Sequence, residues 1–359
     1  MQRAPRVFAT IAAMTLLTAA CGGGGGAEVD SDAQAELGEL AMNASEERNE
    51  QVCEAAKDNG PIMLYVTLPP ADVEAQIEGF NQLYPDLDVE YYRGGSTGSM
   101  INRVLTEAGA GQLDADVSWN NDNIVFVLDS QEGMFLDFRS SYADAYDEDF
   151  RITNNSYPSY VNYWMWAYNT DAVAEADLPR TYDDLLEERW AGEFTAAAYA
   201  DWFFGLWQIL GDERAEAYFT QLGEQSPFLA DQFTPALLPV IQGEKILTMS
   251  TNSGVLSGQQ AKGAPLAGYF PDETTVARTV PISIFANGGN AEGGLCFTEY
   301  VLSPEGQQLL ADRGRVPGNT EVDPQPAELR PADAELIDYA KFIPEEAEWE
   351  QRMSELLGG

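Results

Sequence analysis

The chain contains no histidine, and this absence removes several kinds of site at once. A sequence of 359 residues without histidine cannot form a Ser-His-Asp or Cys-His catalytic centre, and it offers no imidazole ligand to a metal. The three cysteines, Cys21, Cys53 and Cys296, show no CxxC spacing, which excludes a zinc knuckle and a thioredoxin-like centre. We therefore expect no catalytic residue, no metal ligand and no cofactor.

Basic residues are also scarce. The chain has 19 lysine and arginine residues against 59 aspartate and glutamate residues. A chain this acidic repels nucleic acid and anionic lipid surfaces, so we expect neither to bind the folded body. The acidic residues are spread along the sequence, which favours a heavily solvated surface suited to high salt. An acidic site for a cationic ligand is the alternative.

The one long apolar run lies at the N-terminus. Two arginines precede residues 7–20, which are apolar but too short to span a bilayer comfortably, so residues 1–20 indicate a secretory signal. Thr18-Ala19-Ala20-Cys21 resembles a bacterial lipoprotein box, and five glycines follow it. This predicts a lipid on Cys21 and a tether or linker over residues 21–57. A plain secretory signal, cleaved elsewhere, is the alternative.

Assigning Cys21 to a lipid leaves an even pair of cysteines. Outside the cytoplasm, Cys53 and Cys296 could form one disulfide. The loop that it closes would be long, so it would stabilise the fold by about 2–4 kcal/mol. Two unpaired buried thiols are the alternative.

The most informative stretch runs from Val89 to Trp119. A strand with period-two alternation meets Gly94 and Gly95, a helix with one apolar face follows, and a second strand ends at Trp119. This is one β-α-β unit with polar residues at the strand ends, where open α/β sheets bind ligands. An apolar strand over residues 62–66 and a helix after it extend the pattern to parallel α/β.

A second α/β set follows the aromatic sequence VNYWMWAY at residues 161–168, which we interpret as one strand. Helices are expected over residues 201–210, 215–222 and 235–242, a strand over 246–250, and a helix start at residues 251–254. With 45% apolar residues and this length, the chain can build two packed domains.

In order and spacing, these segments resemble the extracellular solute-binding proteins of ABC importers, of the iron(III)- and phosphonate-type in the hinged two-lobe class. The resemblance covers roughly residues 60–325. The sequences that carry it are LYVT at 64–67, GGSTGSM at 94–100, DADVSW at 114–119, AYNTDAV at 167–173, GEKILTMS at 243–250, and LSPEGQQLL at 302–310 with RVPGN after it.

The resemblance implies a periplasmic-binding-protein-like α/β fold of type II, with a ligand cleft between the lobes. Residues 58–157 and 285–325 would form lobe one, and residues 158–284 lobe two. The crossings between lobes would lie near 158–168 and 274–284. Residues 326–359 are expected to be helical and to pack on lobe one.

In lobe one, a helix that begins at Ser96–Ser99 would present unpaired backbone N–H groups and a positive dipole, which favour phosphate, phosphonate or carboxylate. Glycine beside the helix start allows another group to approach the backbone closely. A simple N-cap by Ser96 or Thr97 is the alternative. The expected ligand-binding residues of this lobe are Thr67, Ser96, Thr97, Gly98, Ser99, Trp119, Asn120 and Asn121.

In lobe two, residues 199–202 precede an aromatic helix at a position where relatives touch ligand. Asp201 could cap this helix or accept a hydrogen bond from a ligand, and Trp202 could belong to the core instead. Tyr163 could stack on the ligand, although hinge packing is the simpler reading. The expected ligand-binding residues of this lobe are Tyr163, Tyr199, Asp201, Trp202, Asn252 and Ser253.

Relatives that hold bare iron use a histidine or carboxylate from the early strand and adjacent tyrosines in lobe two. This chain has no histidine, and the matching stretch is Ser250-Thr251-Asn252-Ser253, so direct iron ligation is disfavoured. The sequence predicts a monomeric, non-enzymatic lipoprotein of the cell envelope that captures a small polar, anionic solute for the membrane subunits of an ABC importer. The membrane would be reached through the lipid anchor only.

Three alternatives remain open: iron(III) with a bridging anion, a polyamine, and, remotely, a secreted hydrolase with Asp201 as general base.

Overall fold

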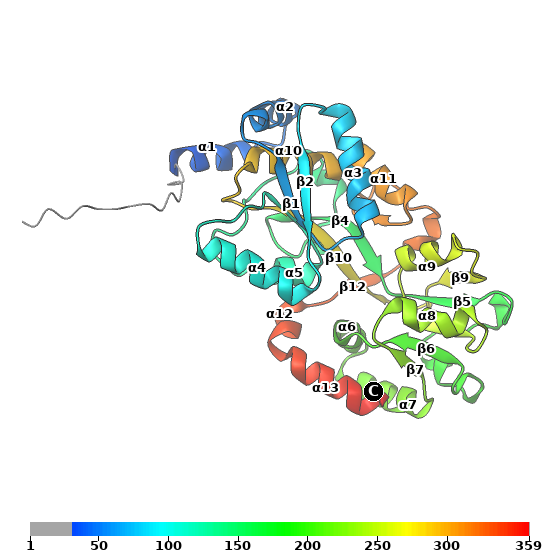
Figure 1. Cartoon of the computed structure of the whole chain (residues 1–359). Coiled ribbons are helices and arrows are strands. Elements are labelled where there is room, and N and C mark those ends of the chain that lie inside the picture. The colour runs from blue at the N-terminus through cyan, green and yellow to red at the C-terminus, as the bar shows by residue number, and fades with distance from the viewer. Residues whose placement is uncertain (1–30, 359) are drawn as a thin grey trace, which may run out of the picture.

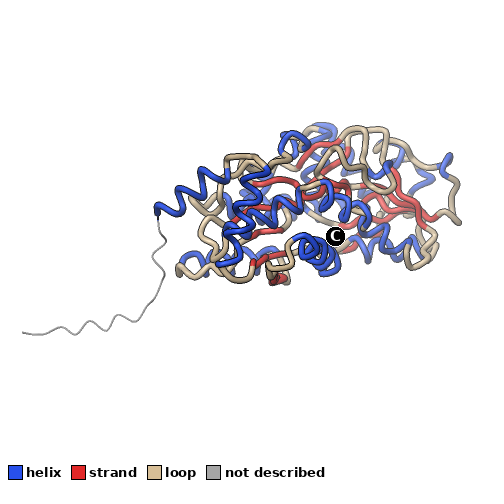
Figure 2. Tube along the Cα trace, turned by 90° about the horizontal axis from the view of Figure 1, so that it is seen from above, coloured by secondary structure: helices blue, strands red, loops and turns tan. Residues whose placement is uncertain are grey.

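The computed structural model describes residues 31–358, and within them the chain forms two lobes, each built around one β-sheet (Figure 1). Seen from above, the strands gather in two groups along an elongated body (Figure 2). The expected two-lobe α/β fold is confirmed.

The first lobe contains a seven-stranded sheet with the order β11-β4-β10-β3-β1-β2, and β12 pairs with β10 beside this path. β1 pairs parallel with β2 and β3, whereas β10 runs antiparallel to β3 and β4. The strands are β1 (Ile62–Val66), β2 (Val89–Arg93), β3 (Val117–Trp119), β4 (Ser156–Tyr163), β10 (Thr275–Ile284), β11 (Val316–Pro317) and β12 (Ala334–Leu336).

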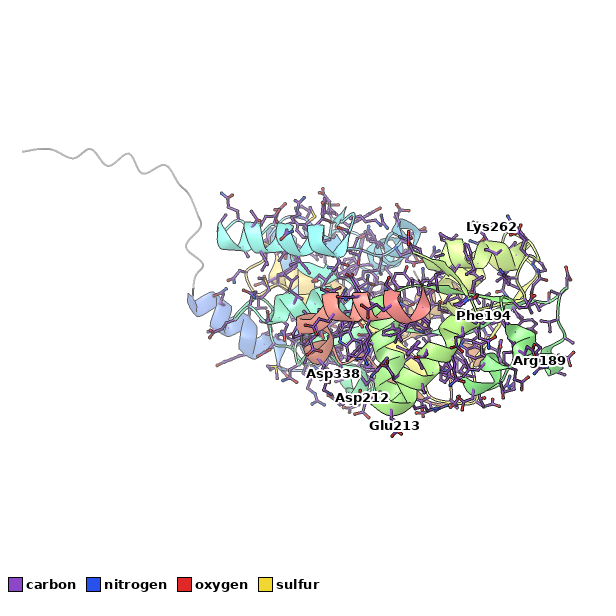
Figure 3. The ribbon with its side chains drawn as sticks, turned by 90° about the horizontal axis from the view of Figure 1, so that it is seen from below. Arg189, Phe194, Asp212, Glu213, Lys262 and Asp338 are labelled. Atoms are coloured by element: carbon purple, nitrogen blue, oxygen red, sulfur yellow. A yellow bond between two sulfur atoms is a disulfide. The ribbon has the colours of Figure 1, made fainter. Side chains whose placement is uncertain are left out.

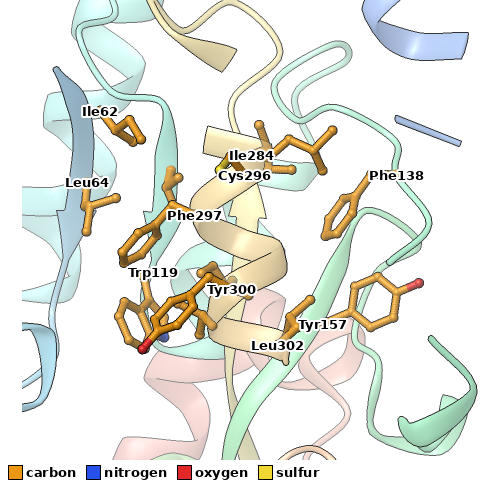
Figure 4. Packing of buried hydrophobic residues seen from close by; sticks show 14 of the residues in the cluster. Ile62, Leu64, Trp119, Phe138, Tyr157, Ile284, Cys296, Phe297, Tyr300 and Leu302 are labelled. Atoms are coloured by element: carbon orange, nitrogen blue, oxygen red, sulfur yellow. The ribbon is translucent and has the colours of Figure 1, made fainter. Parts of the chain in front are cut away.

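Helices cover the faces of this sheet and close its core. Phe297 of α10 packs edge-on against Trp119, with ring centroids 6.2 Å apart, in a cluster that includes Ile62, Leu64 and Ile284 (Figure 4). The helices that follow β1 in this lobe are α3 (Pro70–Leu83), α4 (Thr97–Gly109), α5 (Asp122–Asp129), α10 (Ala291–Leu302) and α11 (Pro304–Asp312). Their starts follow local signals, since Ser96 and Ser303 both cap with their side chains.

The second lobe contains a five-stranded sheet with the order β7-β6-β8-β5-β9. The strands are β5 (Met165–Asn169), β6 (Phe194–Ala197), β7 (Phe228–Ala230), β8 (Leu247–Thr251) and β9 (Leu266–Tyr269). The helices are α6 (Ala200–Leu210), α7 (Asp212–Glu224), α8 (Phe233–Ile241) and α9 (Ser253–Gln260). Aromatic side chains dominate this core, and Phe203 and Phe219 lie with ring centroids 4.2 Å apart.

The chain passes between the lobes at Trp164, where β4 of the first sheet gives way to β5 of the second. The interpretation of residues 161–168 as one strand is therefore wrong. Trp164 donates its backbone N–H to the carbonyl of Val276 on β10, so the chain changes sheets without leaving a buried amide unpaired. The return passage lies between β9 and β10.

The segment expected to be a tether contains structure that belongs to the first lobe. α1 (Ser31–Ala41) and α2 (Glu46–Ala55) precede β1, and α2 packs on α10. Arg48 and Glu299 form a buried ion pair with N···O 2.8 Å, and Cys53 and Cys296 form a disulfide with Cα atoms 5.1 Å apart. The expected linker over residues 21–57 is therefore wrong from residue 31 onward, because α1 and α2 pack on the first lobe, with Leu37 and Ala41 of α1 in its core.

The C-terminal helices pack on the second lobe, which corrects the expectation that they pack on lobe one. β12 pairs with β10, and α12 (Tyr339–Phe342) and α13 (Glu346–Leu357) continue from it. α13 contacts α6 and α7, and Arg352 lies 4.0 Å from the ring centroid of Trp207. Figure 3 shows α13 beside these helices. The labelled Asp338, just before α12, lies near Asp212 at the start of α7. The segment makes a third passage between the lobes.

The expected signal over residues 1–20 and the lipidated Cys21 lie outside the described residues. No helix between residues 31 and 358 has the length and apolar character needed to cross a membrane.

Candidate ligand-binding site between the lobes

The carboxyl ends of three strands meet at one edge of the first sheet. Val66 at the end of β1 lies opposite Arg93 of β2 and Trp119 of β3. The next residues stay in register, since Gly94 donates its N–H to the Val66 carbonyl at 3.0 Å. Thr67 accepts from the backbone N–H of Asn121 at 3.3 Å. The expected residues Thr67 and Asn121 are therefore direct neighbours.

The corresponding edge of the second sheet lies at the ends of β6 and β8, which pair parallel. α6 begins after β6 and α9 begins after β8. Two contacts connect this edge to the first sheet. Arg278 of β10 binds Asp201 of α6 with N···O 3.1 Å, and Arg315, before β11, packs on Gly254 of α9. A methyl group added at Gly254 would lie 1.6 Å from Arg315 Nη1.

We call these two edges, together with Arg278 and Arg315, the interlobe face. Five helices begin on it: α3, α4, α5, α6 and α9. The first turns of α3, α5 and α6 carry Asp72, Asp122 and Asp201, whereas those of α4 and α9 carry no acidic residue. One helix start in each lobe therefore keeps its positive dipole end uncompensated by a carboxylate.

These two helix starts have neutral caps. Ser96 and Ser99 form a reciprocal capping box at α4, and Asn252 accepts from the N–H of Val255 at 3.0 Å at α9. The caps account for one or two of the free N–H groups at each end and leave others available to an anion. Capping and ligand binding, the two sequence readings of Ser96, are compatible.

Asp72 lies between two arginines and is 2% exposed. Arg313 Nε is 2.6 Å from Oδ1, and Arg315 Nη2 is 2.6 Å from Oδ2. The Arg315 guanidinium also lies 5.4 Å from the ring centroid of Tyr160 on β4. One carboxylate cannot neutralise two guanidiniums, so this part of the interlobe face carries surplus positive charge.

Arg278 lies between two carboxylates. Besides binding Asp201, it faces Asp122, whose Oδ2 accepts from the N–H of Thr279 at 3.0 Å. Complete burial raises the pKa of Asp122 from 3.8 to about 6, against the opposing effect of Arg278. The Trp164 ring, with its centroid 5.4 Å away, supports the guanidinium. Charge is close to balance here, unlike at Asp72.

Several expected residues lie at the interlobe face with part of their surface exposed. They are Thr67, Ser96, Thr97, Gly98, Ser99, Asn121, Tyr199 and Asn252. Ser253, at the start of α9, and Asp201 lie on the same face but are 4% and 8% exposed.

Four expected residues are buried away from the exposed part of the interlobe face, and for Trp119 and Asn120 this corrects the sequence interpretation. Trp119 is fully buried and donates its indole N–H to Ser159 at 2.7 Å, and Asn120 is buried with its amide donating to the Tyr65 carbonyl. Trp202 packs on Phe219. Strand alternation explains the fourth case, Tyr163. Arg278 on β10 pairs with Asn162 of β4, so the next residue, Tyr163, points to the opposite face of the sheet. Core packing of Trp202 and hinge packing of Tyr163 were alternatives left open by the sequence, whereas Trp119 and Asn120 were assigned from their position at a strand end alone.

The sequence interpretation missed Asp72, Arg278 and Arg315. A signal for them existed: in a chain so poor in basic residues, the closely spaced Arg313 and Arg315 are unusual. Gly314 between them adopts φ +73°, which glycine tolerates and which allows both side chains to meet Asp72. Within residues 31–358, no three histidine, cysteine, aspartate or glutamate side chains form a group able to hold a metal ion.

Comparison with known families gives a match over most of the chain. Residues 75–336 match the family model described as bacterial extracellular solute-binding protein. A Haemophilus influenzae protein described as uncharacterized is 25% identical over 309 residues, which cover 79% of this chain and 86% of that protein.

Solved structures of similar fold include AfuA from Actinobacillus pleuropneumoniae with fructose 6-phosphate bound, at 20% identity and TM-score 0.65 over 83% of this chain and 99% of that one. Iron-bound HitA from Pseudomonas aeruginosa is 19% identical with TM-score 0.68, covering 82% and 99%. IdiA (FutA) from Trichodesmium with iron and citrate is 20% identical with TM-score 0.69, covering 82% and 99%. At these identities the likeness establishes the fold.

Proposed function

The chain belongs to the bacterial extracellular solute-binding proteins, and from this premise we propose that it captures a small polar anion between its lobes. The protein is the substrate-binding component of an ABC importer, not an enzyme, and acts outside the cytoplasm. The proposed solute is organic and carries a phosphate, phosphonate or carboxylate group.

The concentration of arginine on the interlobe face carries the proposal. In a chain with 59 acidic and 19 basic residues, Arg278, Arg313 and Arg315 come together where the lobes meet. Two of them share Asp72, and the acid-free helix starts of α4 and α9 lie on the same face. An anion would gain charge-assisted hydrogen bonds there from guanidinium and backbone N–H groups.

Rotation of the lobes about the passages between them would bury the solute. Thr67, Thr97, Asn121 and Asn252 are the polar side chains that we assign to its uncharged groups. Small-angle scattering should show a smaller radius of gyration with saturating solute. An unchanged scattering curve with bound solute would argue against closure.

Titration calorimetry with matched pairs of solutes tests the ligand class. We expect fructose 6-phosphate, citrate or an aminoalkylphosphonate to bind, and fructose, which lacks the anionic group, not to bind. The proposal would be overturned if only neutral or cationic solutes bound, and if substitution of Asn252 abolished that binding, which would place it between the lobes.

Iron(III) with a bridging anion is the second candidate, favoured by the iron-bound relatives HitA and IdiA. Tyr199, half-buried on the interlobe face, is the phenol that we assign to that site. Ferric citrate should then produce a purple to red tyrosinate absorption that Tyr199→Phe removes. Calorimetric binding of citrate without iron and without colour would favour the anion alone.

We also propose that Cys21 carries the lipid after removal of residues 1–20, and that the protein is a monomer reaching the membrane through this anchor. Intact-mass measurement of the native protein and of Cys21→Ala would test this. An unmodified Cys21 in protein isolated from membranes would contradict it.

A further inference from the structure

A cavity of about 330 Å³ lies on the face of β4 opposite Arg278, and the proposed function makes no use of it. Its walls come from β4 and neighbouring loops of the first lobe and from the third passage between the lobes at residues 330–334. The lining residues that matter here are Asp147, Asp149, Phe150, Tyr163, Arg330 and Asp333. We call it the hinge cavity.

Tyr163 gives the hinge cavity a polar group without a partner. The residue is 8% exposed as a whole, and its hydroxyl makes no hydrogen bond to any other of residues 31–358. Phe150 and Phe270 hold the ring from its edges, with centroids 6.2 and 6.3 Å away. Burial raises the pKa of Tyr163 to about 12, so the phenol is neutral and its oxygen can accept a hydrogen bond. The hydroxyl oxygen is not among the buried unpartnered groups of the described residues, so it is open to water in the cavity, and a bound N–H donor would take the place of that water.

The charges that line the hinge cavity favour a cation. Three solvent-exposed carboxylates, Asp147, Asp149 and Asp333, line it together with one guanidinium, that of Arg330. Arg330 is fixed as part of the wall, because its Nη2 donates to the carbonyls of Pro317 and Val322 at 3.2 and 3.3 Å.

The spacing of the carboxylates decides between a metal ion and an extended cation. Among the described residues they do not form a group that could hold a metal ion. A compact ion would therefore touch them one at a time, whereas an organic cation with separated N–H groups reaches several. Its methylene groups would pack on Phe150 and the Tyr163 ring, where an ammonium is also attracted by the aromatic face.

We propose that the hinge cavity binds a small organic ammonium ion, with the Tyr163 hydroxyl as hydrogen-bond acceptor and Asp147, Asp149 and Asp333 as counter-charges. This site lies apart from the interlobe face and is independent of the solute that the interlobe face takes. A cavity of this size suits a linear diamine, which matches the surplus of two negative charges.

Titration calorimetry of the whole protein with putrescine, and with 1,4-butanediol as its uncharged counterpart, tests the proposal. We expect saturable binding of putrescine only. Tyr163→Phe should weaken it about tenfold, because one hydrogen bond to a charged group is lost. Its melting temperature should stay unchanged, since the hydroxyl has no partner in the protein. Asp149→Asn should weaken binding about threefold.

Two control variants separate the hinge cavity from other acidic surface. Asp144→Asn changes an exposed carboxylate of the same connection that does not line the cavity, and should leave the affinity unchanged. Asn252→Ala changes the interlobe face and should also leave it unchanged. Equal binding of butanediol, an unaffected Tyr163→Phe variant, or loss of putrescine binding in Asn252→Ala would each overturn the proposal. None of these results bears on whether an anion binds between the lobes.

Discussion

At the interlobe edge of the first lobe one carboxylate, Asp72, meets two guanidiniums, whereas at the edge of the second lobe Asp201 meets one, Arg278, which also faces Asp122. The first arrangement leaves positive charge over, and the second is nearly neutral. Both Arg278 and Arg315 contact the second lobe, but only the group around Asp72 has guanidinium charge left over, and we propose that Arg315 offers this charge to the ligand. If substituting the two arginines had the same effect on stability and on ligand affinity, this difference between the lobes would be disproved.

The largest effect should come from removing Arg278, because no second arginine forms an ion pair with its partner Asp201 among the described residues. Arg278→Ala should lower the free energy of unfolding by about 3–5 kcal/mol, because Asp201 and Asp122 stay buried without a counter-charge. Arg315→Ala should lower it by about 1–2 kcal/mol, since Arg313 still binds Asp72. Urea denaturation of both variants measures the difference. Equal losses would show that the two ion pairs are not distinct.

The pH dependence of stability should reveal the raised pKa of Asp122. Its pKa of about 6 in the folded state exceeds its ordinary value of 3.8, so between these pH values the folded protein binds more protons than the unfolded chain. Stability should therefore fall as pH rises from about 4 to 6, by about 3 kcal/mol for this group alone. The loss is complete about one pH unit above the pKa of the folded state, near pH 7.

Asp122→Asn should remove its share of that fall. Part should remain, because burial also raises the pKa of Asp116 to about 6. Urea midpoints measured from pH 4 to 7 for both proteins give the comparison. An unchanged pH profile in Asp122→Asn would mean that Asp122 ionises in the folded protein as it does in water.

For anion affinity we expect the opposite ranking: among variants that fold, loss of Arg315 should matter more than loss of Arg278. Arg315→Ala should weaken binding of the best anionic solute about tenfold, since one charge-assisted hydrogen bond is lost. Arg352→Ala, on the far helices of the second lobe, is the matched control and should leave affinity unchanged. Calorimetry at two salt concentrations measures both, and an unaffected Arg315→Ala variant would remove this residue from the site.

The smallest effect concerns the two neutral caps, one in each lobe. Ser96→Ala and Asn252→Ala should each cost about 1 kcal/mol of stability, because one helix N–H loses its acceptor. Asp171→Asn, on an exposed turn of the second lobe, serves as control. Thermal unfolding measures all three. A cap variant as stable as the unchanged protein would mean that the serine or asparagine contributes only to the ligand.

Local features were predictable from the sequence because they depend on neighbouring residues. The apolar strand at residues 62–66, the helix starts at Ser96 and Ser303, and the α/β alternation all follow from periodicity and capping. Single residues of the site were predictable only as positions at strand ends. Thr67 and Asn121 lie side by side at strand ends with part of their surface exposed, but Trp119 and Asn120, beside Asn121 in the sequence, are buried.

The sequence by itself determined the class of protein: strands alternating with capped helices, an acidic composition without histidine, and a set of motifs in the family's order. Only the tertiary structure decided that Trp164 divides two sheets, that the C-terminal helices join the second lobe, and that Asp72 meets Arg313 and Arg315. The physical reason is distance along the chain. Asp72 and Arg315 are more than two hundred residues apart, and no local rule of propensity or capping records which distant charge a buried carboxylate will find.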